Sequence, residues 1–403
     1  MRILRIFYDW PGPWGGLAPA GYEMTREQLK QGHKVTLMCG YWQNNPPKEL
    51  ENVTIIPTFR EPIEGTIYFT SSVILFFKYF FWRNKYKVDV IHSHGHFAIW
   101  IYLYRKIIKS MPFGKFENEP LFVTHFHNTF AGRWESLKKE NKSIKWFSEK
   151  IAWPLGVRSD KWALESSDLC IFVSQNLLEE AVKYYGADRN KCLVVENGVN
   201  TELFKKVNSI ERDRTRKELG YDVFDFVIIN YGNMVARKNI TNLVAALPYL
   251  PLNFKLLLIG SGSKEYMEQI DKVIIDNLLG NRVKKISYTP YNELPIPIQC
   301  SDLFVLPSDF EGLPKVVLEA LSCEIPTLVS GFKFIDPLEG VTYIEDKDPK
   351  KIAEQIIEIS KKPVKIDIDS FRLKFSWKTK MGIVNNLYQR FIAEKNAKNI
   401  WIS

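Results

Sequence analysis

Two glutamates, Glu311 and Glu319, lie on either side of the expected start of a helix in the second half of the chain. The apolar run 303–306 indicates a buried strand, and a turn-rich loop leads from it to a helix over 315–323 with Pro314 in its first turn. A helix N-terminus offers unpaired N–H groups and about half a positive charge to a diphosphate. Carboxylates there can accept hydrogen bonds from sugar hydroxyls. The spacing indicates a nucleotide-sugar site, although acidic residues are also common at solvated helix starts.

The residues around these glutamates resemble a known family. The segment Glu-Gly-Leu-Pro-Lys-Val-Val-Leu-Glu-Ala-Leu at 311–321, with its flanks at 301–308 and 326–330, is similar to the donor-site signature of the retaining glycosyltransferases of family 4. Weaker matches follow in the family's order from Trp14 to Tyr388. The resemblance implies an α/β protein of the GT-B fold, with two doubly wound Rossmann-like domains facing a cleft. It implies that Glu319 holds the ribose diol, that Glu311 holds a hydroxyl of the donor sugar, and that the donor is also bound by Gly312, Leu313 and Pro314.

A second group of candidate residues follows the expected strand 226–231. The resemblance implies that Lys238 contacts the donor diphosphate, where a cation stabilises the leaving group. The family usually has an arginine at the position of Asn233, and Arg237 is expected to replace its charge with a bidentate guanidinium. Two glycines after the next strand are also expected to line the donor site, Gly260 and Gly262.

The loop after the opening strand carries two adjacent glycines, Gly15 and Gly16. Without side chains there, the backbone can approach a phosphate or an acceptor closely and offer N–H groups. The resemblance places a glycine-rich, donor-binding loop at this position. No G-x-G-x-x-G pattern follows the strand, which argues against a dinucleotide-dependent dehydrogenase.

Histidines close two of the expected strands. His125 and His127 end the strand 122–126, at the edge where open parallel sheets bind ligands. The resemblance implies that a histidine here lies near the reacting sugar and bonds a donor hydroxyl, and His127 matches that position best. His125 would point the same way in a regular strand, whereas a turn at Phe126 would separate the two rings.

Three further histidines, His92, His94 and His96, alternate along another strand end. Such spacing can indicate a metal site, but the pattern runs into a glycine-containing loop and lacks a closed ligand set. We interpret these residues as packing and lining. We therefore expect no metal and no cofactor. The nucleoside diphosphate sugar is expected to be a substrate.

The composition fits two globular domains. A chain of 403 residues with 45% apolar residues is too long for one ordinary core. Strand-like runs alternate with helical segments, which predicts parallel sheets covered by helices. We expect an acceptor-binding domain over 1–204, a donor-binding domain over 205–374, and, from the resemblance, a helix within 375–403 that crosses back onto the first domain. The expected strands are 3–7, 34–39, 88–92, 122–126, 169–174 and 191–195, then 226–231, 255–259, 283–287, 303–306 and 327–330.

The cysteines and the N-terminus indicate the compartment. Five cysteines without paired spacing are expected to be free buried thiols of a reducing environment. The sequence enters a strand pattern at once, without a signal-peptide pattern or an apolar span of about 20 residues. We expect a cytoplasmic protein.

The net charge of +9 favours an anionic partner. No nucleic-acid-binding signature is present, so nucleic acid is not expected. The aromatic run 73–87 contains four basic residues and has the composition of a helix at a lipid interface. A buried helix packed on the sheet is the favoured alternative, and docking on an anionic membrane is the second. The basic residues are Lys78, Arg83, Lys85 and Lys87.

Together these features predict a metal-independent, retaining hexosyltransferase that uses a nucleoside diphosphate sugar and a saccharide or polyprenyl-linked acceptor. Two other functions stay open. One is a nucleotide-sugar epimerase of the same fold, which needs no acceptor. The other is a non-catalytic, membrane-associated binding subunit with an eroded donor site, for which Asn233 is the main argument. The sugar, the base and the acceptor are not specified by the sequence.

Overall fold

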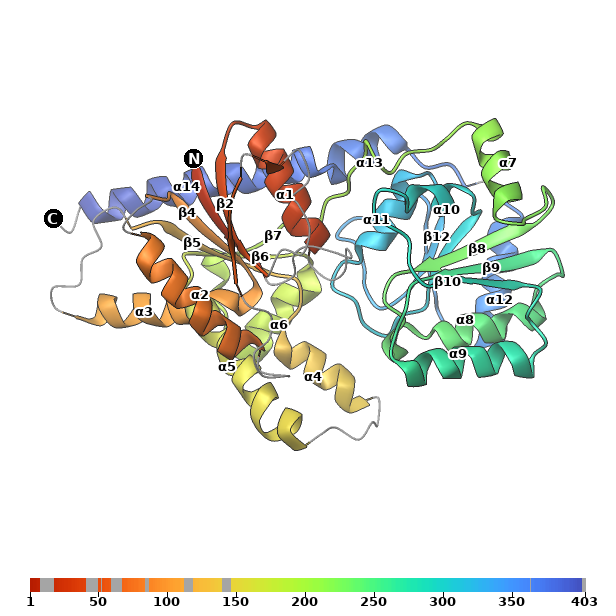
Figure 1. Ribbon diagram of the computed structural model, residues 1–403, viewed down its shortest axis with the longest axis horizontal. Helices are drawn as coiled ribbons and strands as arrows, with labels where there is room; N and C mark the ends of the chain where they lie inside the picture. The colour runs from red at the N-terminus through yellow and green to blue at the C-terminus, as the bar shows by residue number, and fades with distance from the viewer. Residues whose placement is uncertain are drawn as a thin grey trace. The chain divides into compact units, whose positions relative to one another are not determined.

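The computed structural model describes residues 1–7, 18–40, 50–51, 53–58, 67–83, 87–111, 119–139, 146–362 and 364–400. The chain divides into two compact units (Figure 1). Unit 1 consists of Met1–Asn197 and Trp377–Ser403, and unit 2 of Gly198–Ser376. These limits differ by a few residues from the domain ranges expected from the sequence.

Unit 1 contains a seven-stranded sheet in the order β3-β2-β1-β4-β5-β6-β7, in which all neighbours are parallel. The direction of strand succession reverses between β1 and β4, which makes the carboxyl ends of these two strands a place where doubly wound sheets bind ligands. β4, β5 and β6 are buried along their whole length, as expected of a sheet covered on both faces. The strands are β1 Arg2–Ile6, β2 Lys34–Cys39, β3 Thr54–Pro57, β4 Val90–His94, β5 Leu121–Phe126, β6 Leu169–Phe172 and β7 Cys192–Val194.

The helices of unit 1 follow the apolar spacing of their sequences. The last helix, α14, places five apolar residues three or four positions apart in the same core as β1 and β5. They are Trp377, Met381, Val384, Tyr388 and Phe391. The helices are α1 Ala18–Lys30, α2 Ile67–Arg83, η2 Gly95–Ala98, α3 Ile99–Ser110, α4 Phe130–Lys139, η3 Ser148–Ala152, α5 Trp153–Ser166, α6 Gln175–Tyr185, η4 Arg189–Lys191 and α14 Trp377–Ile400.

Unit 2 contains a six-stranded parallel sheet in the order β10-β9-β8-β11-β12-β13, and its succession reverses between β8 and β11. The strands are β8 Phe226–Tyr231, β9 Phe254–Ile259, β10 Val283–Ile286, β11 Leu303–Leu306, β12 Thr327–Val329 and β13 Val341–Tyr343. The helices are α7 Ser209–Glu218, η5 Ala236–Lys238, α8 Ile240–Ala246, η6 Leu247–Tyr249, α9 Lys264–Asp276, α10 Pro295–Gln299, α11 Lys315–Ser322, α12 Pro349–Ser360 and α13 Ile368–Phe375.

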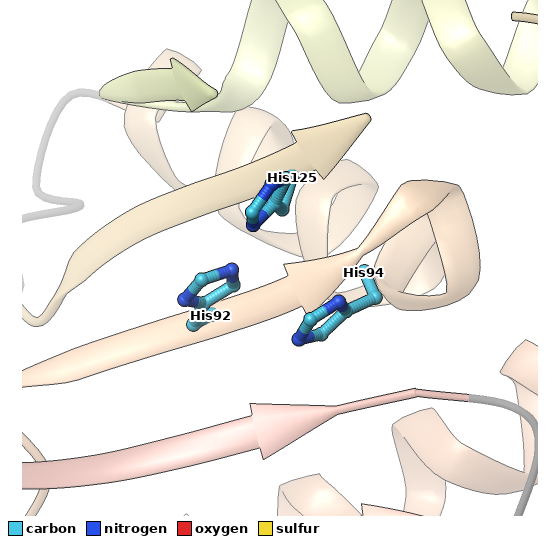
Figure 2. Close-up of side chains that lie close together, drawn as sticks. All are labelled: His92, His94 and His125. Carbon is cyan, nitrogen blue, oxygen red and sulfur yellow. The ribbon is translucent and has the colours of Figure 1, made fainter. Parts of the chain in front are cut away.

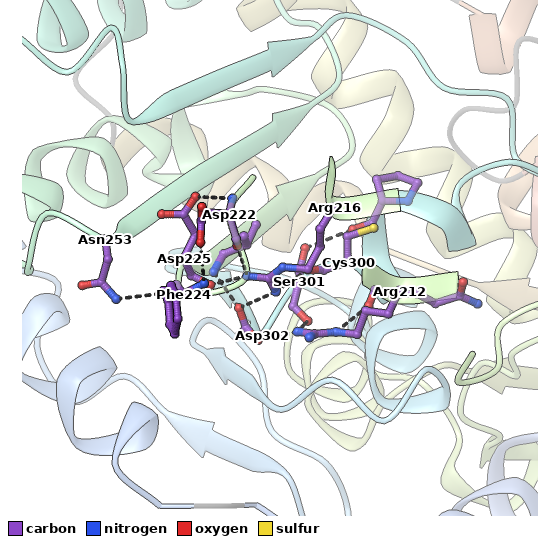
Figure 3. Close-up of polar contacts among 12 residues, drawn as sticks. Arg212, Arg216, Asp222, Phe224, Asp225, Asn253, Cys300, Ser301 and Asp302 are labelled. Atoms are coloured by element: carbon purple, nitrogen blue, oxygen red, sulfur yellow. Dashed lines mark hydrogen bonds and ion pairs between the residues drawn. The ribbon is translucent and has the colours of Figure 1, made fainter. Parts of the chain in front are cut away.

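A buried arginine ties α7 to the amino-terminal end of this sheet (Figure 3). The Arg216 guanidinium is 2% exposed and donates to the Asp302 carboxylate at 3.1 Å and to the Cys300 carbonyl at 3.0 Å. Asp302 also accepts the Val227 backbone N–H at 2.7 Å. Because the buried charge is paired, removal of either Arg216 or Asp302 alone would leave its partner buried without compensation and would destabilise the fold.

Three expectations about the fold are confirmed: doubly wound parallel sheets, free buried cysteines, and a C-terminal helix packed in the core of unit 1. β3 and β13 were not expected from the sequence, because these edge strands have only four and three residues and none of those residues is fully buried. Within the described ranges, no helix combines the length and apolar character needed to span a bilayer.

Candidate functional site

Lys238 lies at the point of unit 2 where strand succession reverses. It ends the short helix η5, which follows β8, and it is 8% exposed. Its ammonium nitrogen lies against the backbone of Gly232, because a Cβ built on that glycine would be 3.1 Å from Nζ. Burial lowers the pKa of Lys238, and the nearby Glu311 carboxylate opposes that shift. A nearly buried cation is therefore present at the strand ends where a diphosphate is expected.

Glu311 is held in place by neighbours on two loops. Its Oε1 lies 2.6 Å from Nη1 of Arg237 and accepts a hydrogen bond from the Ser308 hydroxyl at 3.0 Å. Arg237 also donates to the Phe310 carbonyl at 2.6 Å. The guanidinium expected to face the diphosphate thus already binds the carboxylate expected to face the sugar. The contact of Arg237 with the donor stays a prediction, and its contact with Glu311 was not expected from the sequence.

Glu319 lies inside α11 and is 6% exposed. The Tyr231 hydroxyl donates to the Val316 carbonyl at 2.7 Å, and the pKa of Tyr231 is raised by burial and by the Glu319 carboxylate beside it. The placement of Glu311 on the loop and Glu319 in the helix is as expected. The helix boundary differs, because Pro314 has extended backbone and precedes α11 instead of lying in its first turn.

The remaining donor-site residues of unit 2 shape the backbone. Gly260 has φ +135°, and a Cβ on it would lie 2.0 Å from the Gly232 carbonyl oxygen. A Cβ on Gly262 would lie 1.9 Å from the Met234 carbonyl oxygen. These glycines let the segment after β9 pack directly on the segment after β8. Asn233, in the segment after β8, is exposed. Just before α11, Leu313 is buried and Gly312 is half-buried.

Four histidines of unit 1 form a stack at the carboxyl ends of β4 and β5, part of which Figure 2 shows. His92 and His94 belong to β4, and the rings of His125 and His127 stack at 4.6 Å with an interplanar angle of 16°. The turn considered at Phe126 therefore does not separate His125 from His127. His94 links the two strands, since its ring stacks on His92, His125 and His127.

His96 does not continue this stack. The strand ends at His94, and His96 lies in η2, where its Nδ1 is 2.5 Å from the Asp160 carboxylate. Asp160 also accepts the Phe130 backbone N–H at the start of α4 and the Tyr185 hydroxyl. The alternation read from the sequence thus ends at His94, two residues before His96, and this histidine packs in a separate buried cluster.

Three ring nitrogens, one each from His92, His94 and His125, lie within 4.8 Å of one another. However, Nε2 of His94 is 3.0 Å from an Arg5 guanidinium nitrogen, and Nδ1 of His94 is 3.0 Å from Nε2 of His127. A cation bound here would have to displace one of these contacts and approach a permanent positive charge. The geometry therefore disfavours a metal ion.

Burial keeps three rings of this stack, those of His92, His94 and His125, uncharged. The pKa values of His92 and His94 lie well below the ordinary histidine value, because burial disfavours the charged ring and because Arg5 and the neighbouring titratable rings oppose a further positive charge. Burial and Arg5 also lower the pKa of His125 to about 3. The pKa of Arg5 itself is lowered by burial to about 10. One buried cation and neutral imidazoles are thus expected at neutral pH.

Gly15, Gly16 and Lys85 fall outside the described residues. A cleft of ≈ 610 Å³ lies at the amino-terminal ends of β9 and β10, opposite the candidate donor residues, and none of these residues lines it. Arg5, Ser308 and Tyr231 were not expected as site residues from the sequence. Arg5 carried a signal, since a charge stands within the apolar run of the opening strand.

Comparison with known proteins agrees with this geometry. The model of glycosyltransferase family 4 matches residues 14–203, and the model of glycosyl transferases group 1 matches residues 211–375. The chain therefore belongs to the family 4 glycosyltransferases, which have the GT-B fold.

Three relatives illustrate the match. The chain is 21% identical to the D-inositol 3-phosphate glycosyltransferase of Corynebacterium glutamicum, over 96% of this chain and 94% of that enzyme. It is 30% identical to the UDP-Gal:alpha-D-GlcNAc-diphosphoundecaprenol alpha-1,3-galactosyltransferase of Escherichia coli, over 61% and 59%. The structure of HepE from Anabaena in complex with UDP and glucose has a TM-score of 0.72 at 16% identity, covering 96% of this chain and 99% of HepE. The chain spans only about half the length of several other curated relatives that it matches.

Proposed function

We propose that this glycosyltransferase is a retaining hexosyltransferase that moves a sugar from a nucleoside diphosphate sugar to a saccharide or lipid-linked acceptor, in the synthesis of a cell-surface glycan or glycolipid. The observation that carries the proposal is the convergence of Lys238, the Arg237–Glu311 pair and the start of α11 at the carboxyl ends of β8 and β11. The HepE complex with UDP and glucose supports the donor class. The name of the E. coli relative supports a lipid-linked acceptor.

Each charged group has a distinct role in this proposal. Lys238 and the N–H groups at the start of α11 bind the diphosphate and stabilise its charge as the bond to C1 of the sugar breaks. Glu319 accepts hydrogen bonds from the ribose hydroxyls. Glu311, oriented by Arg237 and Ser308, binds a hydroxyl of the sugar. Because it already accepts these bonds, it is oriented before the donor arrives.

The transfer itself takes place on one face of the sugar. The acceptor oxygen forms a bond to C1 while the bond from C1 to the diphosphate oxygen breaks, and the proton of the acceptor hydroxyl passes to that released phosphate oxygen. We propose that no metal takes part, since Lys238 and the helix start supply positive charge. EDTA should then leave the rate unchanged, and a loss of activity that Mg²⁺ restores would contradict this proposal.

We also propose that α2 docks unit 1 on an anionic membrane. This helix buries Leu75 and Tyr79 but exposes 55% of Phe77 and 76% of Phe81, so it is not a fully buried helix. Two basic side chains of α2 already have contacts within the protein. Lys78 bonds the Pro57 carbonyl, and the Arg83 guanidinium lies 4.1 Å from the centroid of the Phe80 ring. The two exposed aromatic rings are therefore expected to contribute more to docking than the lysines.

Vesicle flotation tests this docking. The double change Phe77→Ser and Phe81→Ser should release the protein from anionic vesicles at low salt while donor hydrolysis continues at its normal rate. Leu252→Ser, which changes an exposed apolar side chain of unit 2, is the matched control. Wild-type protein that does not float with an excess of anionic vesicles would refute the docking.

A panel of nucleotide sugars tests the proposed donor. At about 100 times its dissociation constant, the correct donor should stabilise the protein by about 2.7 kcal/mol. Glu319→Ala should lose at least half of that shift but keep the melting temperature of the free protein. Diphosphate release that depends on an added acceptor would support transfer. Epimerised donor without any acceptor would identify an epimerase, and binding without turnover a binding subunit.

A further inference from the structure

Arg5 occupies an unusual position for a charged residue. It lies in β1, at the point where strand succession reverses in unit 1, and its side chain is fully buried. Among the described residues, its guanidinium donates to Gln28 Oε1, to the Met24 sulfur at 3.7 Å, and to Nε2 of His94 at 3.0 Å. Gln28 is fixed in turn, because its amide donates to Asn385 of α14 at 2.7 Å. Arg5 is thus held rigidly against His94.

Only one protonation state of His94 is compatible with its contact to Arg5. Arginine has five N–H donors and no acceptor, so Nε2 of His94 must contribute its lone pair. A neutral imidazole with a bare Nε2 carries its proton on Nδ1, and a protonated ring would set two N–H groups against each other. His94 is therefore neutral, with the hydrogen on Nδ1.

The tautomer of His94 determines the tautomer of His127, the next ring in this chain of hydrogen bonds. Nδ1 of His94 lies 3.0 Å from Nε2 of His127, within hydrogen-bond distance. Since His94 Nδ1 carries the hydrogen, it donates and Nε2 of His127 accepts. His127 must then also be neutral, with its own proton on Nδ1. The permanent charge of Arg5 thereby decides which nitrogen of His127 can donate, through one intermediate ring.

We propose that Arg5 and His94 are positioning residues that fix His127 as the neutral, Nδ1-protonated tautomer. This inference rests on the proposed function and on the expectation, implied by the family resemblance, that His127 bonds a hydroxyl of the donor sugar. In that role His127 donates its Nδ1–H to an oxygen, such as a sugar hydroxyl, and holds its proton throughout the reaction. It neither supplies a proton to the leaving group nor accepts one from the acceptor.

We call the hydrogen-bonded series Arg5, His94 and His127 the relay. The stacked rings around the relay maintain its geometry. His94 and His127 are nearly parallel, at 5.3 Å and 12°, and His125 stacks on both. On the far side, the Tyr388 hydroxyl of α14 bonds Nδ1 of His92, whose ring stacks on His94 at 4.9 Å. Neither ring of the relay can turn over without breaking a hydrogen bond and a ring contact.

Nitrogen NMR on the full chain tests the tautomer directly. The protein has six histidines, so ¹⁵N-histidine labelling gives few signals, and His127→Gln identifies those of His127. We expect a protonated Nδ1 and a bare Nε2 for His127 in the wild type at neutral pH, before any donor is added. A protonated Nε2, a doubly protonated ring, or binding of Zn²⁺ by the unliganded stack would overturn the proposal.

Two substitutions at His94 separate the relay from simple packing. His94→Phe keeps a ring in the stack but removes both hydrogen bonds, so the tautomer of His127 should change. His94→Gln can accept from Arg5 and donate to His127, so the Nδ1–H tautomer should return. If His94→Phe does not fold, Arg5→Met and Arg5→Lys make the same comparison. An unchanged tautomer in His94→Phe or Arg5→Met would overturn the relay.

Kinetics connect the tautomer to the reaction. We expect kcat/KM to fall about tenfold in His94→Phe, the size of one lost hydrogen bond of about 1.4 kcal/mol, with much of that loss regained in His94→Gln. Equal losses in both variants would overturn the assigned role. The experiments distinguish a failure of the proposed function from a failure of the relay. A correct tautomer in a protein that turns over no nucleotide sugar would refute the proposed function alone, whereas transfer with the opposite tautomer would refute the relay alone.

Discussion

Replacing His125 by phenylalanine should make unit 1 less sensitive to acid. His125 is buried in β5, and neither of its ring nitrogens has a hydrogen-bond partner among the described residues. The substitution therefore removes no hydrogen bond, and the phenyl ring can retain the stacking on His127. At pH 7.5 we expect the variant to be as stable as the wild type or more stable, because two unpaired buried nitrogens disappear.

The size of the effect follows from the pKa. The pKa of His125 is lowered to about 3 in the folded protein, against about 6.5 in an unfolded chain. Between these values the unfolded state binds one more proton than the folded state, so stability falls as the pH falls through 6.5. The slope is about 1.4 kcal/mol per pH unit, which gives a loss of about 2 kcal/mol between pH 7.5 and pH 5. His125→Phe should be spared this loss.

Urea unfolding of both proteins at pH 7.5 and pH 5 measures this difference, because contributions from other titrating groups cancel. Phe126→Leu changes an adjacent buried side chain without a titrating group, and its effect on the free energy of unfolding should be the same at both pH values. Equal acid sensitivity of wild type and His125→Phe would show that His125 is charged in the folded state, and the argument for a neutral stack would fail.

Three more predictions concern unit 2. Glu319→Ala should weaken donor binding by about 1.5 to 3 kcal/mol in calorimetry, while Glu311→Ala should chiefly lower kcat; unchanged affinity in Glu319→Ala would disprove the ribose assignment. Arg237→Ala should slow turnover as much as Lys238→Ala, and Asn233→Arg should restore part of the Arg237→Ala loss; wild-type kinetics in Arg237→Ala would exclude both roles given to this arginine. Gly260→Ala should lower the melting temperature, because its Cβ would collide with the Gly232 carbonyl and overpacking costs about 1 to 3 kcal/mol. Gly280→Ala, where a Cβ meets no atom within 4 Å, is the control, and equal melting temperatures would contradict the packing argument.

Most of the fold could be predicted because buried parallel strands are continuous apolar runs. The run 303–306 is an example, and the structure shows it as β11 without change. The placement of Glu311 and Glu319 followed from local turn and helix signals next to that strand. Edge strands such as β3 were missed because their few, only partly buried residues make too short an apolar run to mark a strand.

The contacts of the site could not be predicted in the same way. The pair formed by Arg237 and Glu311 joins loops 74 positions apart, and local patterns do not report which loops meet. For Arg5, the sequence showed a charge inside a strand but not the imidazole that receives its hydrogen bond. Cytoplasmic location, metal independence and retention of configuration stay predictions.

The position of α14 has a consequence for synthesis on the ribosome. Unit 1 is completed by residues that follow the whole of unit 2, and Tyr388 and Phe391 close a core begun by Ile3. At about 5 to 20 residues per second, translation of the roughly 200 residues that separate Asn197 from the end of α14 takes about 10 to 40 seconds. During that time, the nascent first sheet lacks its covering helix and exposes apolar surface. Chaperone dependence should therefore concentrate on unit 1, and removal of the last two dozen residues should impair the yield of folded protein more than damage to unit 2 does.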